Sequence, residues 1–207
     1  MNKPYIVGLT GGIASGKTVA AEHLAGLGAV IVDADQISRD LTREGGEAIP
    51  AIRAQFGDGV MNGGQLDRRA LAYLVFGDAG HRRALEAILH PMVQRRMMGE
   101  IAEAAEAGAT IAFLSVPLLF ETGTDALCDE VWLMALEPEE QIKRVMARDG
   151  ITREEAEARM NSQMSLEDKL KRADVIIRTD CPIVETRQEL EALYRDLKKR
   201  ITKVESK

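Results

Sequence analysis

The sequence predicts an α/β fold in which a parallel sheet of five strands is covered by helices, and three observations support this. A short apolar run at residues 5–9 does not alternate with polar residues, which is typical of a buried strand. A glycine turn follows, and then a helical pattern extends from Lys17 to about Leu27. After Gly28 a second apolar run covers residues 29–32, so strand, helix and strand form a unit whose two strands are parallel.

The turn after the first strand has the spacing G-x-x-x-x-G-K-T of a phosphate loop. Gly11 and Gly16 allow backbone angles that a Cβ would penalise, so the loop N–H groups can form an anion-binding nest at a helix N-terminus. Lys17 can reach the outer phosphates of ATP, and the Thr18 hydroxyl can ligate Mg²⁺. An ordinary glycine-rich turn is the alternative, which the flanking strand and helix disfavour. The candidate nucleotide contacts are Gly11, Gly12, Ile13, Ala14, Ser15, Gly16, Lys17, Thr18 and Val19.

The second strand ends in two carboxylates, Asp33 and Asp35. Ligands of open α/β sheets bind beyond the carboxyl ends of the strands, so these aspartates and the phosphate loop are expected at one edge. One carboxylate could take a proton from an attacking hydroxyl while the other orients the substrate or a metal-bound water. A solvated turn with helix-capping aspartates is the alternative.

Residues 36–106 are mostly helical in pattern, have a glycine turn at 62–64 and show no strand signal. A helix here is predicted to end near Leu89, because His90 precedes Pro91 and the residue before a proline disfavours helical angles. The region is therefore expected to be a helical insertion that holds a substrate. A helix-end cap is the alternative for His90, and a solvated helix face is the alternative for Arg82, Arg83, Arg95 and Arg96.

Three more apolar runs, at residues 110–114, 131–136 and 174–178, complete the predicted sheet, and a last helix covers about 182–200. Beyond the third strand Pro117 stops regular pairing. The apolar run after it, which includes Leu118 and is closed by Glu121, is expected to line a pocket at the same sheet edge.

Two short helices are predicted to meet at Gly150 and to present arginines. Arg144 and Arg148 lie four residues apart on one face of the first helix, and Arg159 lies in the second, which a capping box opens at residues 152–155. A mobile hairpin of this kind can screen the charge of a transferring phosphoryl group and exclude water. A salt-bridged surface hairpin is the alternative.

The composition fits one α/β domain of 207 residues with an appended lobe. The net charge of −6 argues against a nucleic-acid partner. Cys128 and Cys181 are far apart, which suits a reducing compartment. No apolar run approaches the ~20 residues that span a bilayer, and no signal peptide precedes the first strand. We therefore expect a cytoplasmic protein without a membrane partner.

Several motifs together resemble those of the dephospho-CoA kinases, in order from about residue 5 to residue 180. The phosphate loop alone is shared by many families, whereas the Asp-Ala-Asp and Pro-Leu-Leu-Phe-Glu segments are far more specific. The segments that carry the resemblance are residues 6–13, 33–39, 66–68, 90–91, 116–121, 159–169 and 173–174.

The resemblance implies a P-loop kinase that phosphorylates the ribose 3′-hydroxyl of dephospho-CoA with ATP, the last step of coenzyme A synthesis. It implies Asp35 as the base and Asp33, Arg39, His90, Leu118 and Glu121 as candidate substrate contacts. Two positions depart from the family pattern: Ser115 replaces a common acidic residue, and Arg178-Thr179-Asp180 replaces an Asp-Asn pair. The predicted parts are a core (about 1–36, 107–140 and 173–207), a substrate-binding insertion (about 37–106) and a lid (about 141–172).

Two other functions also use a phosphate loop. A GTPase switch should show a guanine-reading Asn-Lys-x-Asp segment, which the sequence lacks. A motor ATPase should end a core strand in a Walker B carboxylate, but the run at 111–114 ends in Ser115 and the run from Val131 ends at Leu136, so neither fits. Another kinase of the same fold, acting on a nucleotide or a small alcohol, remains the alternative. In the leading hypothesis Lys17 and Mg²⁺ neutralise the phosphates, Asp35 accepts the proton, and Arg144, Arg148 and Arg159 close over the transferring group. The sequence leaves the oligomeric state open.

Overall fold

The computed structural model describes residues 3–205 and, for residues 203–205, the backbone alone. It consists of two compact units, residues 1–32 with 101–207 and residues 33–100. The long helix α5 (Ala79–Glu106) contributes residues to both units.

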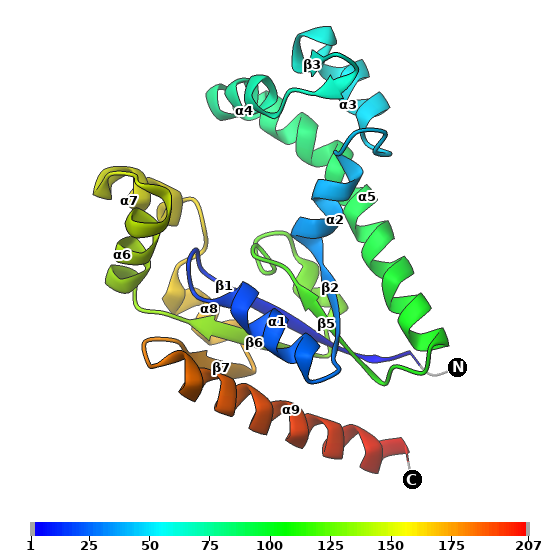
Figure 1. The fold of residues 1–207 in the computed structure, drawn as a ribbon, viewed down its shortest axis with the longest axis vertical. Helices are drawn as coiled ribbons and strands as arrows, with labels where there is room; N and C mark the ends of the chain where they lie inside the picture. Colours follow the sequence, from blue (N-terminus) through cyan, green and yellow to red (C-terminus); the bar gives the residue numbers. More distant parts are fainter. Residues whose placement is uncertain (1–2, 206–207) are drawn as a thin grey trace. The chain divides into compact units, whose positions relative to one another are not determined.

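The first unit is built on a five-stranded sheet with the strand order β2-β5-β1-β6-β7. The central strand β1 pairs in parallel with β5 and β6, and β6 pairs in parallel with β7 (Figure 1). The parallel α/β fold expected from the sequence is confirmed. The strands are β1 (Tyr5–Gly11), β2 (Val30–Asp33), β5 (Ile111–Ser115), β6 (Glu130–Ala135) and β7 (Val175–Arg178).

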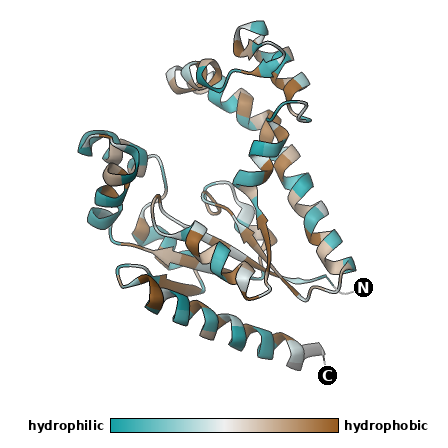
Figure 2. Ribbon diagram, in the orientation of Figure 1, coloured by the Kyte–Doolittle hydropathy of each residue, from teal (hydrophilic) through white to brown (hydrophobic). Residues whose placement is uncertain are grey.

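Helices α1 and α9 pack on one face of this sheet. Their apolar residues join those of the strands in one core, in which Phe113 makes edge-to-face contacts with Trp132 and Tyr194 at centroid distances of 5.2 and 5.7 Å. The strands are largely hydrophobic, whereas α6 and α7 are largely hydrophilic (Figure 2). The helices of the unit are α1 (Lys17–Gly26), α6 (Pro138–Asp149), α7 (Arg153–Asn161), α8 (Leu166–Arg172) and α9 (Ile183–Glu205), with a 3₁₀ turn η2 (Thr124–Leu127).

A buried carboxylate ties α9 to the sheet. Glu130, at the start of β6, is 6% exposed and accepts hydrogen bonds from the Trp132 indole at 2.6 Å and the Tyr5 hydroxyl at 3.2 Å. Arg200 of α9 pairs with both carboxylate oxygens, at 3.1 and 2.8 Å. Burial and the neighbouring Glu130 charge raise the pKa of Tyr5 above its usual value. The charge of Glu130 is therefore compensated, as a buried carboxylate requires.

The second unit is mainly helical, as predicted, but two details of the prediction were wrong. Helix α5 continues through Pro91, because a proline removes only one i→i−4 hydrogen bond and the turns on both sides remain. His90 therefore lies inside a helix and does not cap its end. A hairpin of two-residue strands surrounds the predicted glycine turn, where Gly63 and Gly64 have φ of 58° and 87°. Strands this short leave no pattern in the sequence.

The elements of this unit are α2 (Ala34–Leu41), α3 (Ile49–Phe56), η1 (Asp58–Val60), β3 (Met61–Asn62), β4 (Gln65–Leu66), α4 (Arg68–Gly77) and the first part of α5.

Candidate active site

The phosphate loop connects Gly11, the last residue of β1, to Lys17, the first residue of α1. Ala14 and Gly16 have φ of 59° and 90°, and such angles are uncommon for a residue with a Cβ. The Ser15 N–H donates to the Gly12 carbonyl at 3.1 Å, which closes the turn. Alternation between left-handed and right-handed residues turns backbone N–H groups toward one concave side. The loop therefore has the backbone of an anion-binding nest.

Close packing explains the first two glycines of the loop. A Cβ on Gly11 would overlap Ser15 Oγ and lie 2.8 Å from the Met134 carbonyl oxygen, and a Cβ on Gly12 would lie 2.5 Å from Gln141 Oε1. The Ser15 hydroxyl is buried and makes no hydrogen bond within residues 3–205. A cradle that only glycine fits, lined by a buried hydroxyl and placed before a helix N-terminus, suits a phosphate group.

Lys17 and Thr18 occupy the first turn of α1. The Lys17 ammonium donates to Ser115 Oγ at 2.7 Å, and Ser115 is the last residue of β5, the strand beside β1. The ammonium group therefore lies at the carboxyl end of the sheet, where parallel sheets bind ligands. Ser115 stands where the resemblance leads us to expect an acidic residue, and its hydroxyl accepts the hydrogen bond from Lys17.

Val19 and Arg144 line one cavity of about 280 Å³, together with Gly16 and Thr179. Arg144 donates through Nη2 to the Thr179 carbonyl at 2.6 Å. Thr179 is buried, and its own hydroxyl donates to the Ala135 carbonyl at 3.2 Å. The segment after β7, which departs from the expected Asp-Asn pattern, thus orients Arg144 and forms one wall of the cavity.

Arg148 and Arg159, the other two arginines of the predicted lid, share one carboxylate. Arg148 contacts both Asp149 oxygens, at 2.7 and 3.0 Å, and Arg159 donates to Asp149 Oδ2 at 2.6 Å. Their hydrogen bonds and charges, those of Arg148 above all, lower the pKa of Asp149 below its usual value. Helices α6 and α7 lie side by side, and the predicted capping box at Thr152 is confirmed (Figure 1). Asp149 therefore holds Arg148 and Arg159 close together.

The turn after β5 contains the two candidate residues Leu118 and Glu121. Leu118 is 38% exposed, whereas its neighbour Leu119 is fully buried and would meet a Cβ on Gly8 at 2.8 Å. Glu121 Oε1 accepts the Met164 N–H at 2.8 Å and pairs with Lys169 at 3.0 Å. Glu121 therefore connects this turn to the segment before α8.

The four remaining candidates, Asp33, Asp35, Arg39 and His90, belong to the second unit. Asp33 is the N-cap of α2, and its Oδ1 accepts the Gln36 N–H at 2.8 Å. Asp35 lies in the first turn of the same helix. The capping alternative thus applies to Asp33, while Asp35 is not the cap.

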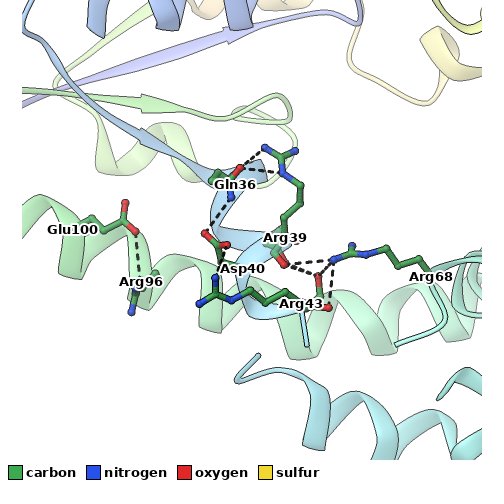
Figure 3. A network of polar contacts seen from close by, with 9 residues as sticks. Gln36, Arg39, Asp40, Arg43, Arg68, Arg96 and Glu100 are labelled. Atoms are coloured by element: carbon green, nitrogen blue, oxygen red, sulfur yellow. Dashed lines mark hydrogen bonds and ion pairs between the residues drawn. The ribbon is translucent and has the colours of Figure 1, made fainter. Parts of the chain in front are cut away.

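A polar network surrounds α2 in this unit (Figure 3). Arg39 donates to Gln36 Oε1 at 3.2 and 3.0 Å, and Gln36 in turn donates to Asp40. At the C-terminal end of the helix Arg68 donates to Thr42 Oγ1 at 3.0 Å and to the Thr42 carbonyl at 3.3 Å. A cation at this end is favourable because the helix dipole is negative there.

Among the side chains that the structure describes, in residues 3–202, no three of His, Cys, Asp or Glu gather as a metal site. No helix in the same range is long and apolar enough to cross a membrane.

Sequence reasoning assigned no role to several residues that contact the candidate site residues in the structure. Asp149 accepts hydrogen bonds from Arg148 and Arg159, and Ser115 accepts one from Lys17. Gln163 accepts a hydrogen bond from the Ile13 N–H of the phosphate loop. Only the Arg148–Asp149 pair had a local signal, because the two residues are adjacent and precede the predicted turn at Gly150. The other contacts join residues 10, 98 and 150 positions apart, which a local pattern does not reveal.

Comparisons with known proteins agree on one family. A family model described as dephospho-CoA kinase matches residues 5–185. The dephospho-CoA kinase of Symbiobacterium thermophilum is 44% identical over 191 residues, which cover 92% of this chain and 80% of that protein. A crystal structure of a Thermus thermophilus protein superposes with a TM-score of 0.81 at 39% identity, covering 95% of this chain and 99% of the other. The dephospho-CoA kinase of Campylobacter jejuni superposes with a TM-score of 0.71 at 28% identity, covering 96% and 98%.

The steric role of Gly11 can be tested with Gly11→Ala and the matched variant Gly26→Ala. A Cβ on Gly11 has no room, so we expect ADP affinity to fall at least about tenfold and stability to fall by about 1–3 kcal/mol. Gly26 ends α1, and a Cβ added there would have nothing within 4 Å. Gly26→Ala should therefore bind ADP normally, and its free energy of unfolding should rise by up to ~1 kcal/mol. ADP titration and urea unfolding measure both effects, and equal ADP affinity in the two variants would contradict the steric argument.

Proposed function

The chain belongs to the dephospho-CoA kinase family, and we propose how its residues share the work of the reaction. The reaction transfers the γ-phosphoryl group of ATP to the ribose 3′-hydroxyl of dephospho-CoA and yields coenzyme A and ADP. The observation that carries the proposal is the phosphate loop, with left-handed Ala14 and Gly16 before the N-terminus of α1. Phosphoryl transfer needs little covalent help, so positioning and charge stabilisation supply most of the rate.

The phosphate loop holds the β- and γ-phosphates of ATP through its N–H groups, and Lys17 offsets their charge. Gly16, Val19 and Arg144, which line the cavity of about 280 Å³, contact the nucleotide beside the loop. The Thr18 hydroxyl would hold Mg²⁺, which when bound neutralises charge on the phosphates. A single hydroxyl suits this ion, because Mg²⁺ keeps several waters and takes its other ligands from the phosphates.

Asp35 is the proposed base, because its carboxylate does not cap α2 and can accept the proton of the 3′-hydroxyl. Asp33, whose Oδ1 is engaged by the Gln36 N–H, orients the substrate or a metal-bound water. The other proposed contacts with dephospho-CoA are Arg39, His90, Leu118 and Glu121.

Arg148 and Arg159 are proposed to exchange Asp149 for phosphate oxygens when the lid closes. Asp149 keeps the two guanidinium groups together before that step, at 2.6–3.0 Å from its oxygens. Charge of this kind, brought to a transferring phosphoryl group, lowers the barrier because the charge develops in the transition state. We also propose that the enzyme works in the cytoplasm, without a nucleic-acid or membrane partner.

A substrate panel tests the function. We expect ADP release to depend on dephospho-CoA and not on nucleoside monophosphates or shikimate, because the family's acceptor is a ribose hydroxyl of dephospho-CoA. A coupled ADP-release assay, with coenzyme A identified by mass spectrometry, measures this. Turnover with shikimate or a nucleotide in place of dephospho-CoA would favour the alternative of another kinase of the same fold.

The two aspartates can be distinguished by Asp35→Asn and Asp33→Asn. Loss of the base should lower kcat ~10²-fold or more in Asp35→Asn, with a modest change in the KM for dephospho-CoA. Asp33→Asn should raise that KM more than it lowers kcat, and asparagine preserves the N-cap of α2. Steady-state kinetics of both variants distinguish the two roles. The reverse order would make Asp33 the base, and full activity in both would exclude carboxylate catalysis here.

The lid can be tested with Arg148→Ala and the matched variant Arg153→Ala. Loss of transition-state charge stabilisation should lower kcat ~10²-fold or more in Arg148→Ala. Arg153 makes exposed ion pairs with Glu139 and Glu157, so its replacement should leave kcat unchanged. If Arg148→Ala alters only the melting temperature, the surface-hairpin alternative is correct.

A further inference from the structure

A buried lysine with one carboxylate partner lies beside the phosphate loop. Lys169 of α8 is 1% exposed, and its Nζ lies 3.0 Å from Glu121 Oε1. A charged group this buried is costly unless it is compensated, and an ion pair with Glu121 provides that compensation. The pair joins α8 to the turn after β5, two parts of the first unit that are 48 residues apart in sequence.

Glu121 also fixes the segment that leads into α8. Its Oε1 accepts the Met164 N–H at 2.8 Å. Burial would by itself raise the pKa of Glu121, but the Met164 hydrogen bond and the Lys169 charge outweigh it and the pKa is lowered. Glu121 is therefore a stable anion that holds residue 164 in place.

The neighbouring residue Gln163 reaches the phosphate loop. Gln163 Oε1 accepts the Ile13 N–H at 3.0 Å, and Gln163 and Lys169 line one cavity of about 380 Å³ with Gly12 and Gln141. The Ile13 side chain packs against the core of the α6–α7 hairpin, made of Ile142, Val145 and Ala156. The tip of the loop is thus held by a hydrogen bond on its backbone and an apolar contact on its side chain.

We propose that Gln163 is a positioning residue for the phosphate loop, and that the buried Lys169–Glu121 pair keeps Gln163 in register with the Ile13 N–H. The loop contains a left-handed alanine immediately after Ile13. Such a conformation persists only where its surroundings hold it. Gln163 supplies that constraint from the end of the lid, so it links lid position to nucleotide affinity. The proposal rests on the proposed nucleotide role of the loop.

The first test compares Gln163→Met with Gln163→Glu and Ser162→Ala. Methionine keeps the length of the side chain and removes the acceptor, so ADP affinity should fall about tenfold, the scale of one lost hydrogen bond, with a change in melting temperature under about 2 °C. Gln163→Glu retains the acceptor oxygen, so this variant should bind ADP more tightly than Gln163→Met does. Ser162→Ala removes only the bond from Ser162 to the Arg159 carbonyl and should leave ADP affinity unchanged.

The second test places Gln163→Met in a Lys169→Met background. If the buried pair acts through Gln163, the double variant should lose little more ADP affinity than Lys169→Met alone, because coupled residues are not additive. Should Lys169→Met fail to fold, Glu121→Gln takes its place, since the amide oxygen can still accept the Met164 N–H. Unchanged ADP affinity in Gln163→Met, or strictly additive losses in the double variant, would overturn the proposal.

Different results would contradict the proposed function and the positioning role of Gln163. ADP binding is measured without dephospho-CoA, so a wild-type protein that binds ADP but does not phosphorylate dephospho-CoA would contradict the proposed function alone. Normal wild-type turnover with normal ADP affinity in Gln163→Met would contradict the positioning role alone.

Discussion

Steric exclusion at the turn between β1 and α1 is the constraint on which the chemistry of the first unit depends. Gly11 lies against the Met134 carbonyl of β6 and the Ser15 side chain, so the chain can leave the central strand here only because residue 11 has no Cβ. Because the turn is this tight, α1 begins directly after it and places Lys17 beside Ser115 at the end of β5. A nest of N–H groups, a helix N-terminus and an ammonium group then share one edge of the sheet.

Carboxylates hold several cations of this acidic chain in place. Glu130 holds Arg200, Asp149 holds Arg148 and Arg159, and Glu121 holds Lys169. The pairs differ in burial, and that difference separates their roles. Lys169 is almost completely buried, so its pair cannot exchange partners cheaply, whereas about half of the Arg148 and Arg159 side chains is exposed. Arg148 and Arg159 are therefore suited to changing partners, and the buried lysine is suited to holding its segment in place.

Local patterns were sufficient for most of the fold. The non-alternating apolar runs correctly indicated β1, β2, β5, β6 and β7. For β1, β5 and β6 the reason is that strands buried on both faces must be apolar at successive positions. Thr152 and Glu155 indicated the start of α7, since a capping box is completed within four residues. The pattern failed at Pro91, where neighbouring turns outweighed a local restriction, and at the two-residue strands of the hairpin. A restriction at one residue did not outweigh a long helix, and strands of two residues are too short to show a periodic pattern.

The sequence by itself determined the phosphate loop, the order of the parallel strands along the chain and the residue types available for phosphoryl transfer, since all three depend on residues close together in the chain. Only the tertiary structure decided the partners of those residues. These contacts span 35 to 150 positions of the chain: Lys17 with Ser115, Ile13 with Gln163, and Arg144 with the Thr179 carbonyl. Such contacts exist because sheet pairing and helix packing bring the chain segments together, and neither hydrophobic periodicity nor motif spacing specifies which polar groups then meet.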